Sequence, residues 1–253
     1  MLHKALYSGH NDHNYFEIAH TIDRLRNNGV DCRALYSFAD NHDVERIHTK
    51  LNDKRHWMPV HILLFCLPGI PSVYYGSEFG IEGRKARGGS DEAIRPQLNL
   101  GELSAGENAC LDVVRALGQI YREEKALAWG EYQQLVLTTK QYAFRRGDVL
   151  IAVNNDGCDA ELTIPCADGR YRGALHGAVW KSENGRLNLK LGPCDGEILI
   201  PEGRSKVQFE PIRTPEQEPK PELNADLRTS SAAAPGREAV AAAASGTPPA
   251  EAQ

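Results

Sequence analysis

The chain has 253 residues, of which 41% are hydrophobic, and a formal net charge of −5 at neutral pH. This length and composition allow a buried core in one or two domains. The mild charge gives no electrostatic basis for binding nucleic acid or an anionic membrane. The apolar run 56–67 is too short for a bilayer, which takes about 20 residues to span.

The first half of the chain alternates between helical and strand-like patterns. Residues 14–27 carry apolar side chains at three- and four-residue spacing, which predicts an amphipathic helix. Asn14 and Glu17 match a capping box at its start. The segments that follow are a strand at 34–39, a helix apolar on nearly all sides at 57–67, a strand at 70–75 and a helix at 109–122. This order predicts parallel strands joined by helices.

The second half changes to short strands. Apolar runs separated by Gly, Asn and Asp occur at 135–137, 142–144, 149–153, 160–164, 169–175, 187–191 and 197–200. This spacing predicts an antiparallel sandwich. We therefore expect a first domain at 1–126 and a second at 127–213. The tail 214–253 is rich in Pro, Ala, Glu and Ser and lacks aromatic residues, which predicts disorder.

The six cysteines give little support for a metal or redox site. They are scattered along the chain and form no Cys-x-x-Cys pair. The sequence does not decide whether two of the last three, Cys158, Cys166 and Cys194, form a disulfide. The run from His10 to His13 contains metal-ligand residue types, but a single short run is weak evidence, and we expect a loop that caps a helix and contacts ligand. We predict no metal site.

Two motifs carry the chemistry. The apolar strand 34–39 runs into FADNHDVER at 38–46, which places His42 and Asp43 just after its end. In an α/β barrel the chemistry lies at the C-terminal ends of the strands. The alternative is structural, with Asp40, Asn41 or Asp43 capping the next helix. About 25 residues later comes PGIPSVYYGSEFGI at 68–81.

Together the two motifs resemble the α-amylase family of glycoside hydrolases, glycoside hydrolase family 13. The upstream run YSGHNDHNYFEIAH is also similar to some bacterial members, and the resemblance covers roughly residues 5 to 200. It implies an α/β fold, the C-terminal part of a TIM (β/α)8 barrel followed by an antiparallel β-sandwich. The motifs resemble the ends of barrel strands seven and eight, so the expected partner is the missing N-terminal half of the barrel.

The resemblance also implies roles for single residues. Asp43 resembles the carboxylate that stabilises the transition state, and His42 a neighbour that binds the same sugar. Asn41 and Arg95 are further substrate-binding candidates, although a surface salt bridge to Asp91 would equally explain Arg95. The family's nucleophile and general acid follow strands four and five, which this sequence does not contain. Glu78 and Glu45 are the candidates for an acid supplied by this chain itself, and Glu78 is expected to be structural.

We therefore expect part of a retaining α-glucan hydrolase or transglycosylase, inactive as an isolated chain. The alternative is a non-catalytic remnant or a carbohydrate-binding module. No cofactor is expected; family members often bind calcium, but mainly through segments absent here. No secretory signal follows Met1, which favours the cytoplasm without deciding the compartment. The sequence leaves open the choice between α-1,4 and α-1,6 bonds and the length of the substrate.

Overall fold

The computed structural model describes residues 2–86, 88, 90–101, 103–204 and 211–212. These described residues all belong to one compact unit. The tail predicted to be disordered, 214–253, lies outside the described residues. Within the described part, no helix is both long and apolar enough to cross a membrane.

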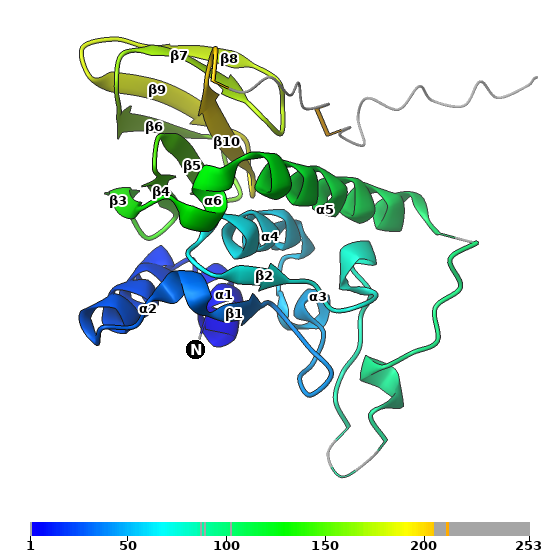
Figure 1. The fold of residues 1–253 in the computed structure, drawn as a ribbon. Helices are drawn as coiled ribbons and strands as arrows, with labels where there is room; N and C mark the ends of the chain where they lie inside the picture. Colours follow the sequence, from blue (N-terminus) through cyan, green and yellow to red (C-terminus); the bar gives the residue numbers. More distant parts are fainter. Residues whose placement is uncertain (1, 87, 89, 102, 205–210, 213–253) are drawn as a thin grey trace, which may run out of the picture. The chain divides into compact units, whose positions relative to one another are not determined.

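The first half consists of helices around a small parallel sheet (Figure 1). Its helices are α1 (Leu2–Asn11), α2 (Tyr15–Asn27), α3 (Ile47–Lys50), α4 (Trp57–Cys66), α5 (Ala105–Glu123) and α6 (Lys125–Trp129). Strands β1 (Tyr36–Phe38) and β2 (Ile70–Ser72) pair in parallel, with Phe38 opposite Ser72. Parallel pairing with α4 between the strands follows the predicted alternation. Among the described residues these two strands form a sheet of their own, and no closed barrel is present.

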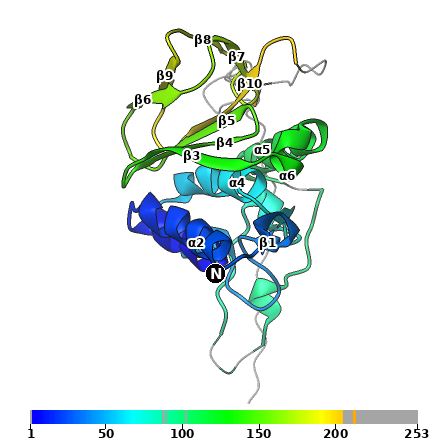
Figure 2. The ribbon, with the colours of Figure 1, turned by 60° about the vertical axis from the view of Figure 1, so that its left-hand side comes forward.

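Helix α4 is the centre of the core. Its sequence is apolar on nearly all sides, so it can bury every face, and its residues from Pro59 to Cys66 are all buried. It contacts α1, β2 and α5, and also the antiparallel strands β5 (Val149–Asn154) and β10 (Gly196–Pro201). Figures 1 and 2 both show the antiparallel strands on one side of α4 and the parallel pair on the other.

The second half forms antiparallel strands, as its short period predicts. The remaining strands are β3 (Tyr132–Leu137), β4 (Gln141–Arg146), β6 (Ala160–Pro165), β7 (Gly169–Gly173), β8 (Val179–Ser182) and β9 (Arg186–Leu191). Six strands pair in the order β3-β4-β5-β10-β7-β8, while β6 pairs with β9. Alternate residues of β6 and β9 are buried, and they share a second hydrophobic cluster with residues of the six-stranded sheet.

Several local expectations are wrong. His10 and Asn11 lie in helix α1 and not in a loop, because Ala5 and Leu6 of that helix are buried in the core. The side chain of Asn14 makes no capping hydrogen bond, and the carboxylate of Glu17 instead accepts one from Ser8 Oγ at 2.7 Å. The open question of a disulfide is answered, since all six cysteines are free.

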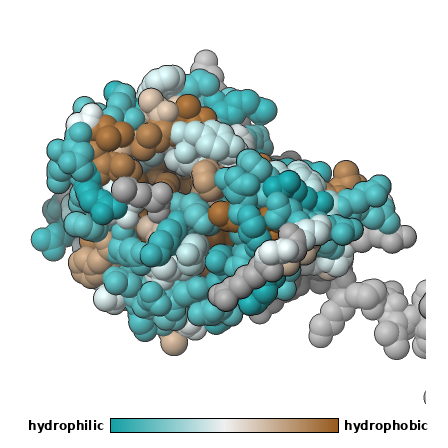
Figure 3. All heavy atoms as spheres, turned by 90° about the horizontal axis from the view of Figure 1, so that it is seen from below, coloured by the Kyte–Doolittle hydropathy of each residue, from teal (hydrophilic) through white to brown (hydrophobic). Residues whose placement is uncertain are grey.

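The parallel pair leaves apolar surface uncovered. Tyr36 and Ile70 lie opposite each other in the β1–β2 ladder and are 66% and 52% exposed. Figure 3 views the protein from below the view of Figure 1, and on this face apolar side chains gather at one side among mainly hydrophilic ones. Each of the two strands has one partner strand among the described residues, so each presents an unpaired edge.

Candidate active site

The candidate site lies in the loop that follows β1, beside the loop that follows β2. The two strands are parallel and in register, so their C-terminal ends meet at one edge of the sheet. Direct contacts join the two loops: Ser77 Oγ donates to Asp40 Oδ1 at 2.7 Å, and Arg46 Nη1 donates to the carbonyl of Tyr75 at 2.7 Å. The two sequence motifs therefore pack directly against each other.

The three acidic and amide residues of the first motif have separate tasks. Asp40 is buried, and its Oδ2 accepts the backbone N–H of Ile47, the first residue of α3, at 2.7 Å. Burial raises the pKa of the Asp40 carboxyl. Asn41 Oδ1 accepts the backbone N–H of Asp43 at 2.9 Å, which shapes the turn. Asp40 thus caps α3, and the Asp43 carboxylate is not needed for capping.

Asp43 and His42 are exposed and adjacent at the end of this turn. Their side chains are 63% and 59% exposed, and His42 Nε2 lies 3.3 Å from Asp43 Oδ2. Arg95 reaches this point from the loop after β2: its Nη2 donates to the His42 carbonyl at 2.9 Å and lies 3.7 Å from Asp43 Oδ1. The same guanidinium lies 2.7 Å from Asp91. The structure therefore brings Asn41, His42, Asp43 and Arg95 together.

Arg46 is a further residue of the site that the sequence does not single out. It is fully buried, and its guanidinium lies over the rings of Tyr74 and Tyr75, 4.5 and 5.1 Å from their centroids. Nη1 also donates to Ser77 Oγ at 3.1 Å. An arginine over aromatic faces is stabilised by their quadrupoles. Arg46 therefore clamps the loop after β1 onto the loop after β2, and it holds the turn that presents Asp43.

An open cavity of about 570 Å³ is lined in part by Asp43. Its described lining residues are His3, Tyr7, Asp43, Val44, Glu45, Lys50, Lys85, Ala86 and Gly88. Glu45 is the other carboxylate in the lining, and its Oε2 lies 2.8 Å from Lys50 Nζ. The hydrogen bond from Lys50 holds the pKa of the Glu45 carboxyl below its usual value. A general acid needs the opposite shift, so Glu45 is poorly suited to donate a proton.

Glu78 does not line this cavity. It lies in a 3₁₀ turn, Ser77–Phe79, that begins after Gly76. Gly76 has a φ of +88°, and a Cβ there would meet the side chain of Ile81, so the turn requires glycine. The Oε2 atom of Glu78 is buried without a hydrogen-bond partner. Glu78 is therefore held in the turn and apart from the Asp43 cavity.

In the part of the chain that the structure describes, no group of metal-ligand side chains includes Asp43. Among the described residues, one group of His, Cys, Asp or Glu has metal-ligand spacing, and its members are Asp53, His56 and Cys194. This group shares no residue with the Asp43 cavity. Calcium prefers six to eight oxygen ligands, so a set with a thiol and an imidazole does not fit it. His10 is buried, with Nδ1 donating to the Leu6 carbonyl at 2.6 Å.

Comparison with known proteins agrees with the geometry. The family model of the α-amylase catalytic domain matches residues 8–135. An α-amylase 3 of Schizosaccharomyces pombe is 28% identical over 145 residues, which cover 56% of this chain and 25% of that protein. A cyclomaltodextrinase of a Bacillus species is 28% identical over 154 residues, which cover 57% of this chain and 26% of that protein.

Solved structures show the same fold. An Anoxybacillus α-amylase matches with a TM-score of 0.66 at 22% identity, over 79% of this chain and 46% of that one. The cyclomaltodextrin glucanotransferase CldA gives a TM-score of 0.66 at 22% identity, over 78% of this chain and 43% of that one. The chain thus spans less than half the length of these relatives. Because the family model covers half of the sequence, the chain belongs to the α-amylase family.

Proposed function

We propose that this chain is part of a retaining α-glucan hydrolase or transglycosylase and supplies its transition-state-stabilising carboxylate. The observation that carries the proposal is the Asp43 carboxylate. Asp43 is exposed in the loop that follows a parallel strand and lines a cavity, and Asp40 accepts the N–H at the start of α3 in its place. The relatives that support the substrate class are named as amylases and cyclomaltodextrin glucanotransferases.

The proposed roles follow from charge and position. Glycoside cleavage passes through an oxocarbenium-like transition state, in which the sugar ring becomes positive. The negative charge of Asp43 would stabilise that ring. His42, 3.3 Å from Asp43, would donate to a hydroxyl of the same sugar, and Asn41 would keep Asp43 in position through its 2.9 Å hydrogen bond. Arg95 would hold the loop through the His42 carbonyl.

The two carboxyl groups that break the bond would come from elsewhere. Retaining enzymes need a nucleophile and a general acid about 5 Å apart. In this chain Glu45 is paired with Lys50, and Glu78 does not line the cavity. The neighbouring strands of the missing barrel half would pair with the unpaired edges of β1 and β2 and cover Tyr36 and Ile70, and the strands that carry the two groups would lie further round the barrel.

We further propose that residues 1–126 are the partial barrel domain and 127–213 a C-terminal β-sandwich. The hydrophobic cluster that β6 and β9 share with the six-stranded sheet supports a sandwich arrangement. No cofactor takes part in the proposed reaction. Under the non-catalytic alternative the same residues would contact sugar. This chain would then not cleave a glycoside even when it is joined to the missing barrel segments.

The test is a reducing-sugar assay with maltooligosaccharides. The purified 253-residue chain should be inactive, because contacts without an acid and a nucleophile do not cleave a glycoside at a useful rate. The chain joined to a family N-terminal barrel half that carries both carboxylates should be active. Activity of the isolated chain that disappears in Glu78→Gln would refute the proposal and make Glu78 the acid. An inactive but folded joined protein would favour the non-catalytic alternative.

A further inference from the structure

A cluster of histidine, cysteine and aspartate lies where the turn before β10 meets the start of α4. Asp53 caps the 3₁₀ turn Lys54–His56 that leads into α4, and Cys194 lies in the turn between β9 and β10. One ring nitrogen of His56, Cys194 Sγ and one Asp53 carboxylate oxygen all lie within 4.8 Å of one another. His56 and Cys194 are 1% and 4% exposed.

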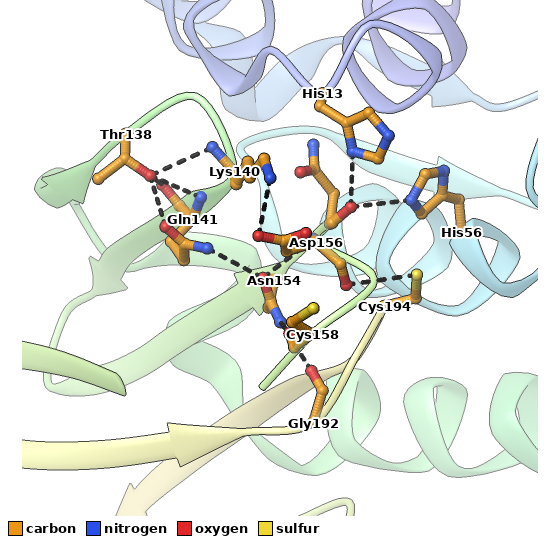
Figure 4. A network of polar contacts seen from close by, with 11 residues as sticks. His13, His56, Thr138, Lys140, Gln141, Asn154, Asp156, Cys158, Gly192 and Cys194 are labelled. Carbon is orange, nitrogen blue, oxygen red and sulfur yellow. Dashed lines mark hydrogen bonds and ion pairs between the residues drawn. The ribbon is translucent and has the colours of Figure 1, made fainter. Parts of the chain in front are cut away.

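His56 has one engaged and one free nitrogen. Its Nε2 donates to the Asn155 carbonyl at 3.0 Å, as Figure 4 shows, and His13 Nδ1 donates to the same oxygen at 2.8 Å. The buried Nδ1 of His56 has no hydrogen-bond partner. Histidines that bind metals commonly donate their other N–H to a backbone carbonyl, which fixes the tautomer and leaves a lone pair for the metal. In the neutral ring of His56 only one nitrogen carries a proton, so the ring can both make such a hydrogen bond and bind a metal.

The thiol of Cys194 points into the same network. Its Sγ lies 3.9 Å from Asp53 Oδ2 and 3.6 Å from the Asp156 carbonyl, a contact drawn in Figure 4. The ligand atoms of a tetrahedral zinc ion are about 3.5 Å apart, given metal–ligand distances of about 2.0 to 2.3 Å. The separations, at most 4.8 Å, would therefore have to shorten by up to about 1.3 Å to reach coordination geometry.

We propose that Asp53, His56 and Cys194 bind a zinc ion, with water completing a four-coordinate site. Sulfur, nitrogen and oxygen donors are the set that zinc prefers. On binding, the thiol proton passes to solvent and the zinc–sulfur bond takes its place. Asp53 Oδ2 also pairs with Arg55 Nη2 at 2.7 Å, so this arginine would have to give way as the cation enters.

The bound ion would tie the second half of the chain to the first. Cys194 lies in the turn that joins the antiparallel strands β9 and β10, whereas Asp53 and His56 lie just before the core helix α4. The site would therefore fix the β9–β10 turn against α4 and stabilise the native state, because zinc would bind the folded chain more tightly than the unfolded one.

The probe is Co²⁺, which replaces zinc and gives a sulfur-to-cobalt charge-transfer absorption band when a thiolate binds it. The chain, purified without a polyhistidine tag, should bind one equivalent, show this band and lose it when Zn²⁺ is added. Cys194→Ser should abolish the band and weaken Zn²⁺ binding on the order of 100-fold, because even residues behind the ligands contribute 10- to 100-fold. Cys158→Ser, at an exposed cysteine, is the matched control and should keep the band.

The Asp53→Asn variant separates a loss of metal binding from a loss of folding. Asparagine retains the capping oxygen that accepts the Arg55 N–H at 3.0 Å, but it removes the ligand charge. This variant should fold as the parent does and bind Zn²⁺ at least ten-fold more weakly. Zn²⁺ should raise the unfolding temperature of the parent and not that of Cys194→Ser. No charge-transfer band in the parent, or an unchanged band in Cys194→Ser, would overturn the assignment.

Discussion

Lowering the pH from about 7 to about 5 should destabilise the chain through two buried histidines. His10 Nδ1 donates to the Leu6 carbonyl, and its Nε2 lies 3.2 Å from the Tyr15 hydroxyl, so both nitrogens of the neutral ring are satisfied. His61 is stacked on Trp57 in α4 and donates to the Trp57 carbonyl at 2.8 Å. Both rings are buried, so solvent cannot stabilise an added proton.

The expected loss follows from the pKa values. Burial lowers the pKa of His10 from 6.5 to about 3 and that of His61 from 6.5 to about 4. Between these values and 6.5 the unfolded chain binds protons that the folded chain does not. Stability is therefore complete above 6.5 and is lost as the pH falls toward the folded values. From about pH 7 to about pH 5, each ring costs about 2 kcal/mol, and the pair about 4 kcal/mol.

The assay is urea unfolding at a series of pH values in this range. His61→Leu keeps a similar volume and should reduce the loss of stability over this range by about 2 kcal/mol. His20→Gln, at an exposed position of α2, is the control and should leave it unchanged. Equal free energies of unfolding at both ends of the range, or the same slope in His61→Leu as in the parent, would refute the reasoning.

Three further changes test the core, a helix start and the exposed sheet. Leu63→Ala, at a fully buried position of α4, should lower the free energy of unfolding in urea by about 2 to 5 kcal/mol, whereas Leu100→Ala at an exposed position should cost less than about 0.5 kcal/mol. Ser104→Ala should cost about 1 kcal/mol in the same assay, because Ser104 forms a capping box with Glu107; no change would mean that α5 does not depend on its cap. Tyr36→Asp should reduce self-association of the isolated chain in light scattering, and a parent that is already monomeric would contradict the role given to that surface.

The main helices and strands could be predicted because their periods are strong. Helix α4 was expected to be buried on all sides and is, since nothing polar but His61 interrupts its apolar run. The sequence pattern does not reveal helix α1, because Ser8 and Gly9 weaken its helical period, while its stability comes from burying Leu6. Strand β8 was missed because it is four residues long and depends on pairing with β7.

The candidate site was predictable only in part. The residues of the first motif are neighbours in sequence, so Asn41, His42 and Asp43 could be named together. The clamp of Arg46 and Ser77 depends on contacts between two loops 31 residues apart, and the pattern of either loop gives no sign of it. Asp53 and Cys194 are 141 residues apart in the sequence, and only tertiary packing brings them together.

The central claim is that the Asp43 carboxylate stabilises the transition state of glycoside cleavage. The direct measurement is kcat on maltooligosaccharides for the chain joined to an N-terminal barrel half, compared with its Asp43→Asn variant. Asparagine keeps the volume and removes the charge, so kcat should fall on the order of 100- to 1000-fold. Asp159→Asn, an exposed carboxylate paired with Lys190, is the control and should retain full activity. A kcat for Asp43→Asn within about two-fold of the parent would contradict the account.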